Sequence, residues 1–187
     1  MLKYTTPVIL YSIFVLLSSA CVSTDINPPA INGFFDLSDF IDQEIIDKKG
    51  RVKKLKKVIS LDGVVETKEL ENFNFEEETE LFRSADINKV AWLDRYETDS
   101  IFYKNGQLKK LAYTSIADDL RTKKLMIHYD TKNIIDSILV DQSSTSVLAK
   151  STQRLLYLPA SGYRIENRQD ITALDPHKLV VDVAFVY

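Results

Sequence analysis

The amino-acid sequence predicts an α+β fold, in which an antiparallel meander sheet of about seven or eight strands is covered on one face by two helices. After position 97, short apolar runs follow one another with connections of turn length. This favours antiparallel pairing, because parallel strands need long crossover connections. Two segments before position 86 have apolar residues at helical spacing. An antiparallel sheet can expose one face to water, but the other must be covered, and these two helices are the only regular elements available.

Both predicted helices have start and end signals. The first begins after residue 34 and ends at Lys48-Lys49-Gly50, with acids near its start and lysines near its end, as the helix dipole favours. The second begins at Asn74, which with Glu77 resembles a capping box, and runs for about three turns to Ala85. The residues that carry the helical spacing are Leu37, Phe40, Ile41 and Ile45 in the first helix, and Phe75, Leu81 and Phe82 in the second.

Two glycine-containing pairs, Asp62-Gly63 and Asn105-Gly106, are typical of tight hairpin turns, because glycine tolerates positive φ. Each predicts a strand on either side of the turn. Residues 85–96 have no clean period and contain the only tryptophan, so we expect an ordered connection that packs Trp92 over one edge of the core. Segments with strand character lie at 52–61, 64–70, 100–104, 108–114, 123–130, 134–142, 147–158, 162–171 and 178–187.

The first 21 residues have the pattern of an export signal that ends at the only cysteine of the chain. Lys3 gives a positive start, residues 8–17 are almost entirely apolar, and residues 18–20 are small, as a signal peptidase requires. This stretch resembles the signal of bacterial lipoproteins, in which an aliphatic residue three positions before the cysteine is followed by two small residues. Here Ser18 occupies the aliphatic position and Leu17 precedes it.

The resemblance implies that residues 1–20 are a signal peptide and that Cys21 becomes a lipid-modified N-terminus. Each buried methylene contributes about 0.8 kcal/mol, so two or more acyl chains suffice to hold a domain at a membrane. Residues 21–33 are expected to be the lipidated cysteine and a flexible tether, because they are small, polar and interrupted by prolines. Residues 34–187 then form a single domain. The expected location is the cell envelope. The outer membrane is preferred, on either its periplasmic or its surface face.

Two other interpretations of the N-terminal segment stay open. An uncleaved transmembrane helix needs about 20 apolar residues, whereas this run is shorter and is interrupted at Tyr11 and Ser12. A plain secretory signal cleaved after Ala20 would leave Cys21 as a free thiol. In either case a chain with one cysteine cannot form an internal disulfide, so an exported domain of this sequence must fold on its core alone.

The charge balance argues against nucleic acid as a partner. The chain has 24 Lys and Arg against 27 Asp and Glu, a net charge of −3, and therefore lacks a general basic footprint. One basic cluster between residues 48 and 57 indicates a solvated strand face, with contact to anionic lipid headgroups as the alternative. Its cations are Lys48, Lys49, Arg51, Lys53, Lys54, Lys56 and Lys57.

No sequence motif indicates an enzyme, a metal site or a cofactor. The Gly-x-Ser-x-Gly nucleophile elbow, glycine-rich phosphate loops and calcium-loop spacing are absent from the sequence. The two histidines are His128 on a predicted strand and His177 in a predicted turn, and zinc is not expected because the cysteine is assigned to lipid. His128 beside a carboxylate would supply a base, so a hydrolase is the remaining enzyme alternative.

Aromatic side chains are abundant on the predicted strands. We expect most of them in the core, although a curved sheet would present some on a concave surface for a lipid chain or a peptide. In outline only, this layout resembles the half-barrel carriers that move lipids and lipoproteins across the bacterial envelope. We therefore expect a non-enzymatic, membrane-anchored envelope lipoprotein that binds a hydrophobic ligand or a protein partner. The alternative is a structural or accessory subunit of an outer-membrane protein complex. The candidate interaction surface consists of Trp92, Tyr103, Tyr113 and Tyr129.

Overall fold

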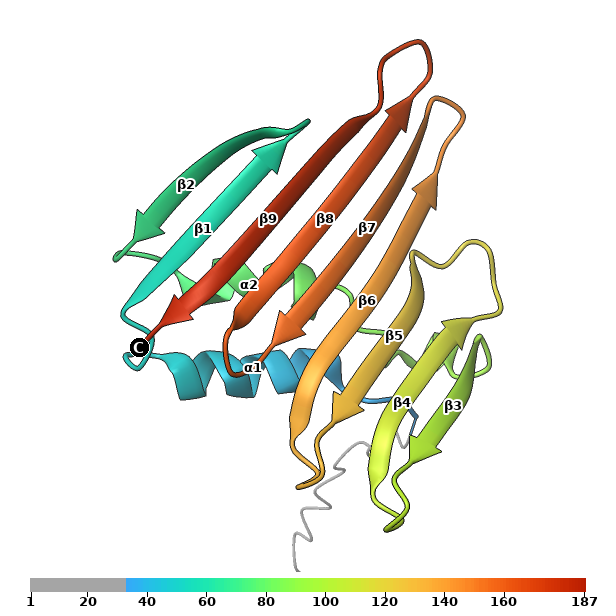
Figure 1. The fold of residues 1–187 in the computed structure, drawn as a ribbon. Coiled ribbons are helices and arrows are strands. Elements are labelled where there is room, and N and C mark those ends of the chain that lie inside the picture. The colour runs from blue at the N-terminus through green and yellow to red at the C-terminus, as the bar shows by residue number, and fades with distance from the viewer. Residues whose placement is uncertain (1–32) are drawn as a thin grey trace, which may run out of the picture. The chain divides into compact units, whose positions relative to one another are not determined.

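The computed structural model describes residues 33–187, so the expected signal peptide and the predicted lipid attachment at Cys21 lie outside the described residues. Within this range the chain forms the predicted α+β unit, one sheet with two helices on one side (Figure 1). The helices are α1 (Leu37–Lys48) and α2 (Phe75–Arg83). The strands are β1 (Lys54–Leu61), β2 (Val64–Leu70), β3 (Tyr96–Phe102), β4 (Leu108–Ser115), β5 (Thr122–Tyr129), β6 (Ile135–Thr145), β7 (Ala149–Leu158), β8 (Gly162–Ile171) and β9 (His177–Val186).

All neighbouring strands of the sheet are antiparallel, in the order β2-β1-β9-β8-β7-β6-β5-β4-β3. β3 to β9 form the predicted meander, in which each strand lies beside the next along the chain. The β1–β2 hairpin joins it at β9, where Lys54 lies opposite Val186 and Leu61 lies opposite Leu179. The sheet of the described residues therefore has nine strands rather than seven or eight, because every segment with strand character joins it.

β3 begins at Tyr96, earlier than the predicted start at residue 100. Tyr96 is only 6 % exposed, and its hydroxyl donates to the carbonyl of Thr122 at 2.8 Å. Its backbone lies opposite Ser115 of β4, which keeps this end of β3 in the sheet. The sequence pattern missed these residues because the rest of β3 is a polar, exposed edge.

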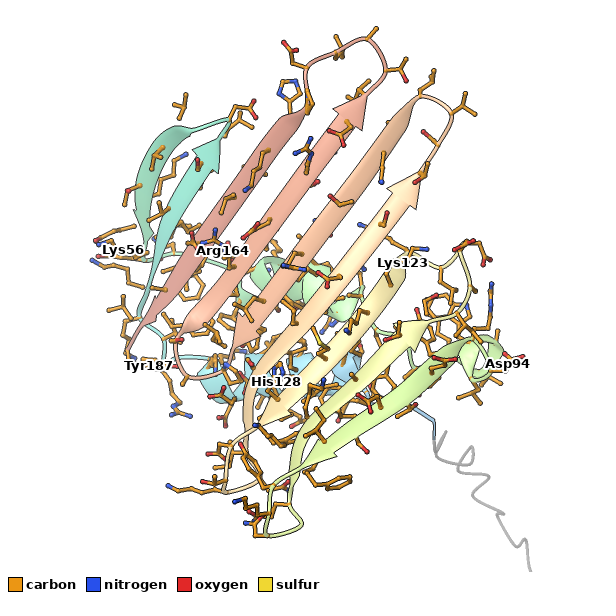
Figure 2. The ribbon with its side chains drawn as sticks, turned by 45° about the vertical axis from the view of Figure 1, so that its right-hand side comes forward. Lys56, Asp94, Lys123, His128, Arg164 and Tyr187 are labelled. Carbon is orange, nitrogen blue, oxygen red and sulfur yellow. The ribbon has the colours of Figure 1, made fainter. Side chains whose placement is uncertain are left out.

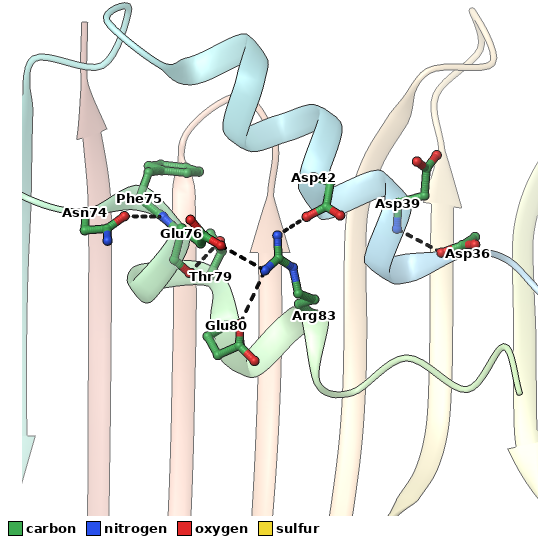
Figure 3. Close-up of polar contacts among 9 residues, drawn as sticks. All are labelled: Asp36, Asp39, Asp42, Asn74, Phe75, Glu76, Thr79, Glu80 and Arg83. Carbon is green, nitrogen blue, oxygen red and sulfur yellow. Dashed lines mark hydrogen bonds and ion pairs between the residues drawn. The ribbon is translucent and has the colours of Figure 1, made fainter.

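Side-chain caps begin both helices where the sequence predicts (Figure 3). The carboxylate of Asp36 accepts from the amide of Asp39 at 2.8 Å, and the side chain of Asn74 accepts from the amide of Glu76 at 3.1 Å. Such bonds satisfy amides that the helix itself leaves without partners. Arg83 near the end of α2 also bonds to Asp42 of α1, which fixes the two helices to each other.

The core lies between the two helices and the sheet face beneath them. Leu37 and Ile41 of α1, Phe82 of α2 and Tyr157 of β7 have no exposed surface. The ring of Phe82 meets those of Tyr157 and Tyr163 edge-on, at centroid distances of 5.3 and 5.7 Å. Side chains therefore fill the space in which a lipid chain would have to lie between helices and sheet.

Two partly buried glutamates attach the helices to this core. Glu44 of α1 accepts from the Tyr157 hydroxyl at 2.9 Å and forms an ion pair with the Lys48 ammonium at 2.7 Å. Glu78 of α2 accepts from the Tyr163 hydroxyl, and from Lys57 of β1 at 2.6 Å. Burial, together with the neighbouring glutamate, raises the pKa of both tyrosine hydroxyls far above the usual value. Both therefore remain neutral hydrogen-bond donors.

Replacement of Phe82 by alanine is expected to destabilise the fold by about 3–5 kcal/mol, because it leaves a cavity between α2 and two sheet tyrosines. The matched control is Phe102→Ala on the edge strand β3. Phe102 is 57 % exposed, so its loss should change stability by about 0.5 kcal/mol or less. Urea unfolding followed by circular dichroism measures both. Equal effects of the two substitutions would contradict this core.

Candidate functional site

One face of the sheet carries no helix in the described part of the chain, and we call it the uncovered face (Figure 1). Successive residues of a strand point to opposite faces. Leu155 and Val183 are buried on the helix side, so their chain neighbours Leu156 and Asp182 lie on the uncovered face. Arg164 of β8 lies between these two in register (Figure 2).

An apolar row crosses the uncovered face, defined by Val58, Met126, Leu139, Leu156 and Leu158. Leu139 of β6 lies opposite Leu156 of β7 on one side and opposite Met126 of β5 on the other. Leu158 follows Leu156 along the same strand face, and Val58 contributes from β1. All five side chains are only partly buried. Met126, Leu139, Leu156 and Leu158 lie side by side, and Val58 lies across the strands of Arg164 and Asp182; all five remain accessible to water.

On the helix side of β6 and β7, the apolar residues give way to amides along each strand. In β7, the neighbour of the buried Leu155 on the same face is Gln153. In the adjacent β6, the neighbour of Val140 on this face is Gln142. No helix covers the apolar row in residues 33–187, so its composition indicates a surface that gains free energy when a partner covers it.

A hollow of about 330 Å³ lies at the β1 end of the apolar row. Val58, Leu156, Leu158 and Ala184 give it an apolar wall. Gly162 shapes its floor, because a Cβ at this position would lie 1.9 Å from the carbonyl oxygen of Val183. Gly162 also has a φ of +150°, which other residues rarely adopt. The hollow therefore depends on a glycine that lets β8 and β9 approach closely.

Charged side chains border this hollow. The Arg164 guanidinium donates to Glu166 at 2.7 Å and to both carboxylate oxygens of Asp182 at 2.9 Å, which raises the pKa of Arg164. On the other side lies Lys56, which is exposed and has no ion pair among the described residues (Figure 2). Glu69 lies opposite it in β2 but bonds to Lys54 at 2.9 Å. The hollow thus combines apolar walls with an available cation.

The structure places the four predicted interaction residues in different surroundings. The Tyr103 hydroxyl donates to the carbonyl of Tyr129 at 2.9 Å, so these two residues lie together. Tyr113 is only 4 % exposed, and its hydroxyl accepts from the amide of Phe35, which makes it a core residue. Burial raises the pKa of Tyr113 and of Tyr129. Trp92 lies half-buried in a 3₁₀ turn against the core.

The sequence-based prediction did not include the apolar row, although the sequence carries a signal for it. Residues 125–127, 138–140 and 155–158 are uninterrupted apolar runs inside strands. An alternating strand buries one face, whereas an uninterrupted run makes both faces apolar. These three runs lie in β5, β6 and β7, which are the neighbouring strands that carry the centre of the row.

The two histidines have different partners and do not contact each other. His128 Nδ1 is 3.2 Å from Ser137 Oγ, its cross-strand neighbour on the uncovered face. A serine nucleophile also needs a group that orients its base, and in the described residues no carboxylate is bonded to His128. His177 Nδ1 lies 2.8 Å from Asp62, and this bond lowers the pKa of Asp62. The described residues contain no cluster of three metal-ligating side chains.

The sequence predicted that the basic cluster between residues 48 and 57 forms one solvated strand face. The structure shows that it does not. Lys48 and Lys57 are largely buried against glutamates of the two helices. Lys54 bonds to Glu69, and Arg51 bonds to Asp47 at 3.1 Å. Most of the positive charge is therefore paired within the domain, which leaves less of it for a lipid surface.

Substitution of Gly162 by alanine is expected to destabilise the fold and to close the hollow, because the new Cβ overlaps the Val183 carbonyl. Gly106→Ala is the matched control, since Gly106 also has a positive φ but has open space around its Cβ position. Overpacking costs about 1–3 kcal/mol, so Gly162→Ala should exceed the control by about this amount. Thermal unfolding of both variants compares them. Equal losses would show that the close approach of β8 and β9 is not required.

No helix within residues 33–187 combines the length and the apolar character that crossing a membrane requires. Comparisons of the chain with protein-family models, with curated proteins and with solved structures found no match. The function proposed below therefore rests on the sequence pattern of the N-terminal segment and on the geometry of the uncovered face.

Proposed function

We propose that this chain is a non-enzymatic envelope lipoprotein, anchored through Cys21, whose domain binds a protein partner on the uncovered face of its sheet. The observation that carries the proposal is the apolar row, which lies on a face without a covering helix in the described residues. The cost of leaving five partly exposed apolar side chains in water disappears when a complementary surface covers them. An outer-membrane location remains the preferred expectation.

The shape of the site favours a protein over a small hydrophobic ligand. Ligand pockets bury most of the ligand surface, whereas this hollow opens onto a broad sheet face. The space between helices and sheet, where an acyl chain would be enclosed, is filled by side chains such as Phe82 and Tyr157. Lys56 at the rim matches an acidic group beside the partner's apolar residues. We therefore propose an apolar protein segment with a flanking acid as the partner.

The anchor is tested by Cys21→Ser. Without the sulfur that would carry diacylglycerol, the chain should move from the membrane fraction to the aqueous phase or accumulate uncleaved. Detergent phase partitioning of the expressed full chain measures this, with Ser23→Ala as a control that leaves the lipid attachment site intact. Unchanged membrane partitioning of Cys21→Ser would contradict lipid anchoring.

The binding surface is tested with a photoreactive amino acid at position 139, the centre of the apolar row. We expect a discrete protein adduct from this position in intact envelopes and none from position 147, whose Val side chain is 97 % exposed in the β6–β7 turn. Mass spectrometry identifies the adduct. An adduct with lipid alone would favour the hydrophobic-ligand alternative, and no adduct at position 139 would contradict binding on this face.

Once that adduct is identified, Leu139→Lys should weaken its binding at least tenfold, or by about 1.4 kcal/mol, because the ammonium would be buried without a partner. Val147→Lys adds the same charge away from the apolar row and should leave binding unchanged. Titration of the purified full-chain variants with the partner measures both affinities, and circular dichroism verifies the fold. Equal affinities would remove the apolar row from the interface.

A further inference from the structure

The two edges of the sheet, β2 and β3, have strand partners on one side only. We propose that two copies of this chain pair antiparallel through β2, so that their sheets become continuous around a twofold axis at Thr67. Every residue of β2 except Leu70 is exposed. Val64 and Val65 are 77 % and 62 % exposed, although both are apolar. An edge of this kind is a template for another strand, and a second copy is the occupant that its sequence fits.

The hairpin turn fixes which backbone groups of β2 are available. Asp62 and Gly63 have φ values of 51° and 89°, which are typical of a two-residue turn whose flanking residues form a hydrogen-bonded pair. The amide of Asp62 donates to Lys178 of β9 at 2.9 Å, so the odd-numbered residues of β1 face β2. It follows that Val65, Thr67 and Glu69 direct their amides and carbonyls to the open edge.

The side chains of β2 match those of a second, antiparallel copy when Thr67 pairs with itself. In this register Val65 lies opposite Glu69, and these positions exchange backbone hydrogen bonds. Between these positions, Glu66 of each copy lies opposite Lys68 of the other, which gives two pairs of opposite charge. Within one chain Lys68 already forms an ion pair with Glu66 at 3.2 Å, so the pairing assembles four alternating charges on one face.

The same charges exclude other self-pairings. A parallel copy in the same register would place Glu66 against Glu66 and Lys68 against Lys68, which repel. The edge strand β3 carries Glu97 and Asp99 and no cation, so an antiparallel copy of β3 centred near either acid brings carboxylates together. The pairing of β2 with β2 is closed by its twofold axis, whereas β2 against β3 of the next copy would form open chains.

The test reverses the charges of Glu66 and Lys68, whose side chains are 62 % and 50 % exposed. The full chain should sediment as a dimer in a concentration series in detergent-containing buffer. Glu66→Lys alone and Lys68→Glu alone should each weaken dimerisation at least tenfold, because each places four like charges at the axis. The double variant should recover the dimer, and a mixture of the two single variants should form a heterodimer.

Several outcomes would overturn the proposal. These are a full chain that is monomeric throughout the series, a dimer that both single variants leave unchanged, and assemblies that grow beyond two copies. Cys21→Ser is run in parallel, because edge pairing does not use the anchor. A dimer that persists in this variant supports pairing through β2, and a dimer that is lost assigns the association to the anchor instead. Binding of the partner at Leu139 is measured separately, so the two proposals can fail independently.

Discussion

The structure depends on the mismatch between a wide sheet and two short helices. At 1.5 Å per residue, α1 and α2 are about 18 and about 14 Å long. Nine strands at their usual spacing span about 38 Å. Two helices of this size cover part of one face and none of the other. Some apolar strand residues are covered by non-helical segments, as Phe34 covers Tyr96 and Tyr113. Every other one must be solvated at a cost, or be covered by something outside residues 33–187.

The helix side resolves this constraint within the chain. Where helices lie over the sheet, the core is formed by large fully buried side chains, and two glutamates hold the helices through the hydroxyls of Tyr157 and Tyr163. Further along, β6 and β7 change to the amide side chains of Gln142 and Gln153. On the uncovered face, Leu139 and Leu156 are apolar although no helix of residues 33–187 lies over them, which is why we propose the binding surface there.

Strand and helix periodicity predicted the α+β class, both helices and all nine strand segments, because these depend on local pattern and turn chemistry. The start of β3 was missed, because Tyr96 is held by a contact with Thr122 that no local pattern records. The burial of Tyr113, and that of Lys48 over the ring of Phe185, also depend on tertiary neighbours. The predicted interaction surface consisted of Trp92 and three tyrosines, whereas the consecutive apolar runs of β5 to β7 point to the uncovered face.

The most direct test of the central claim is oxidative footprinting of the same chain in intact envelopes and after purification. Met126 lies in the apolar row, is only partly buried and has a readily oxidised sulfur. If a partner covers the uncovered face, the oxidation of Met126 and Leu156 should fall severalfold in envelopes, while that of Val147, 97 % exposed in the β6–β7 turn, should not change. Equal oxidation of Met126 in both preparations would contradict the assignment of this face to a partner.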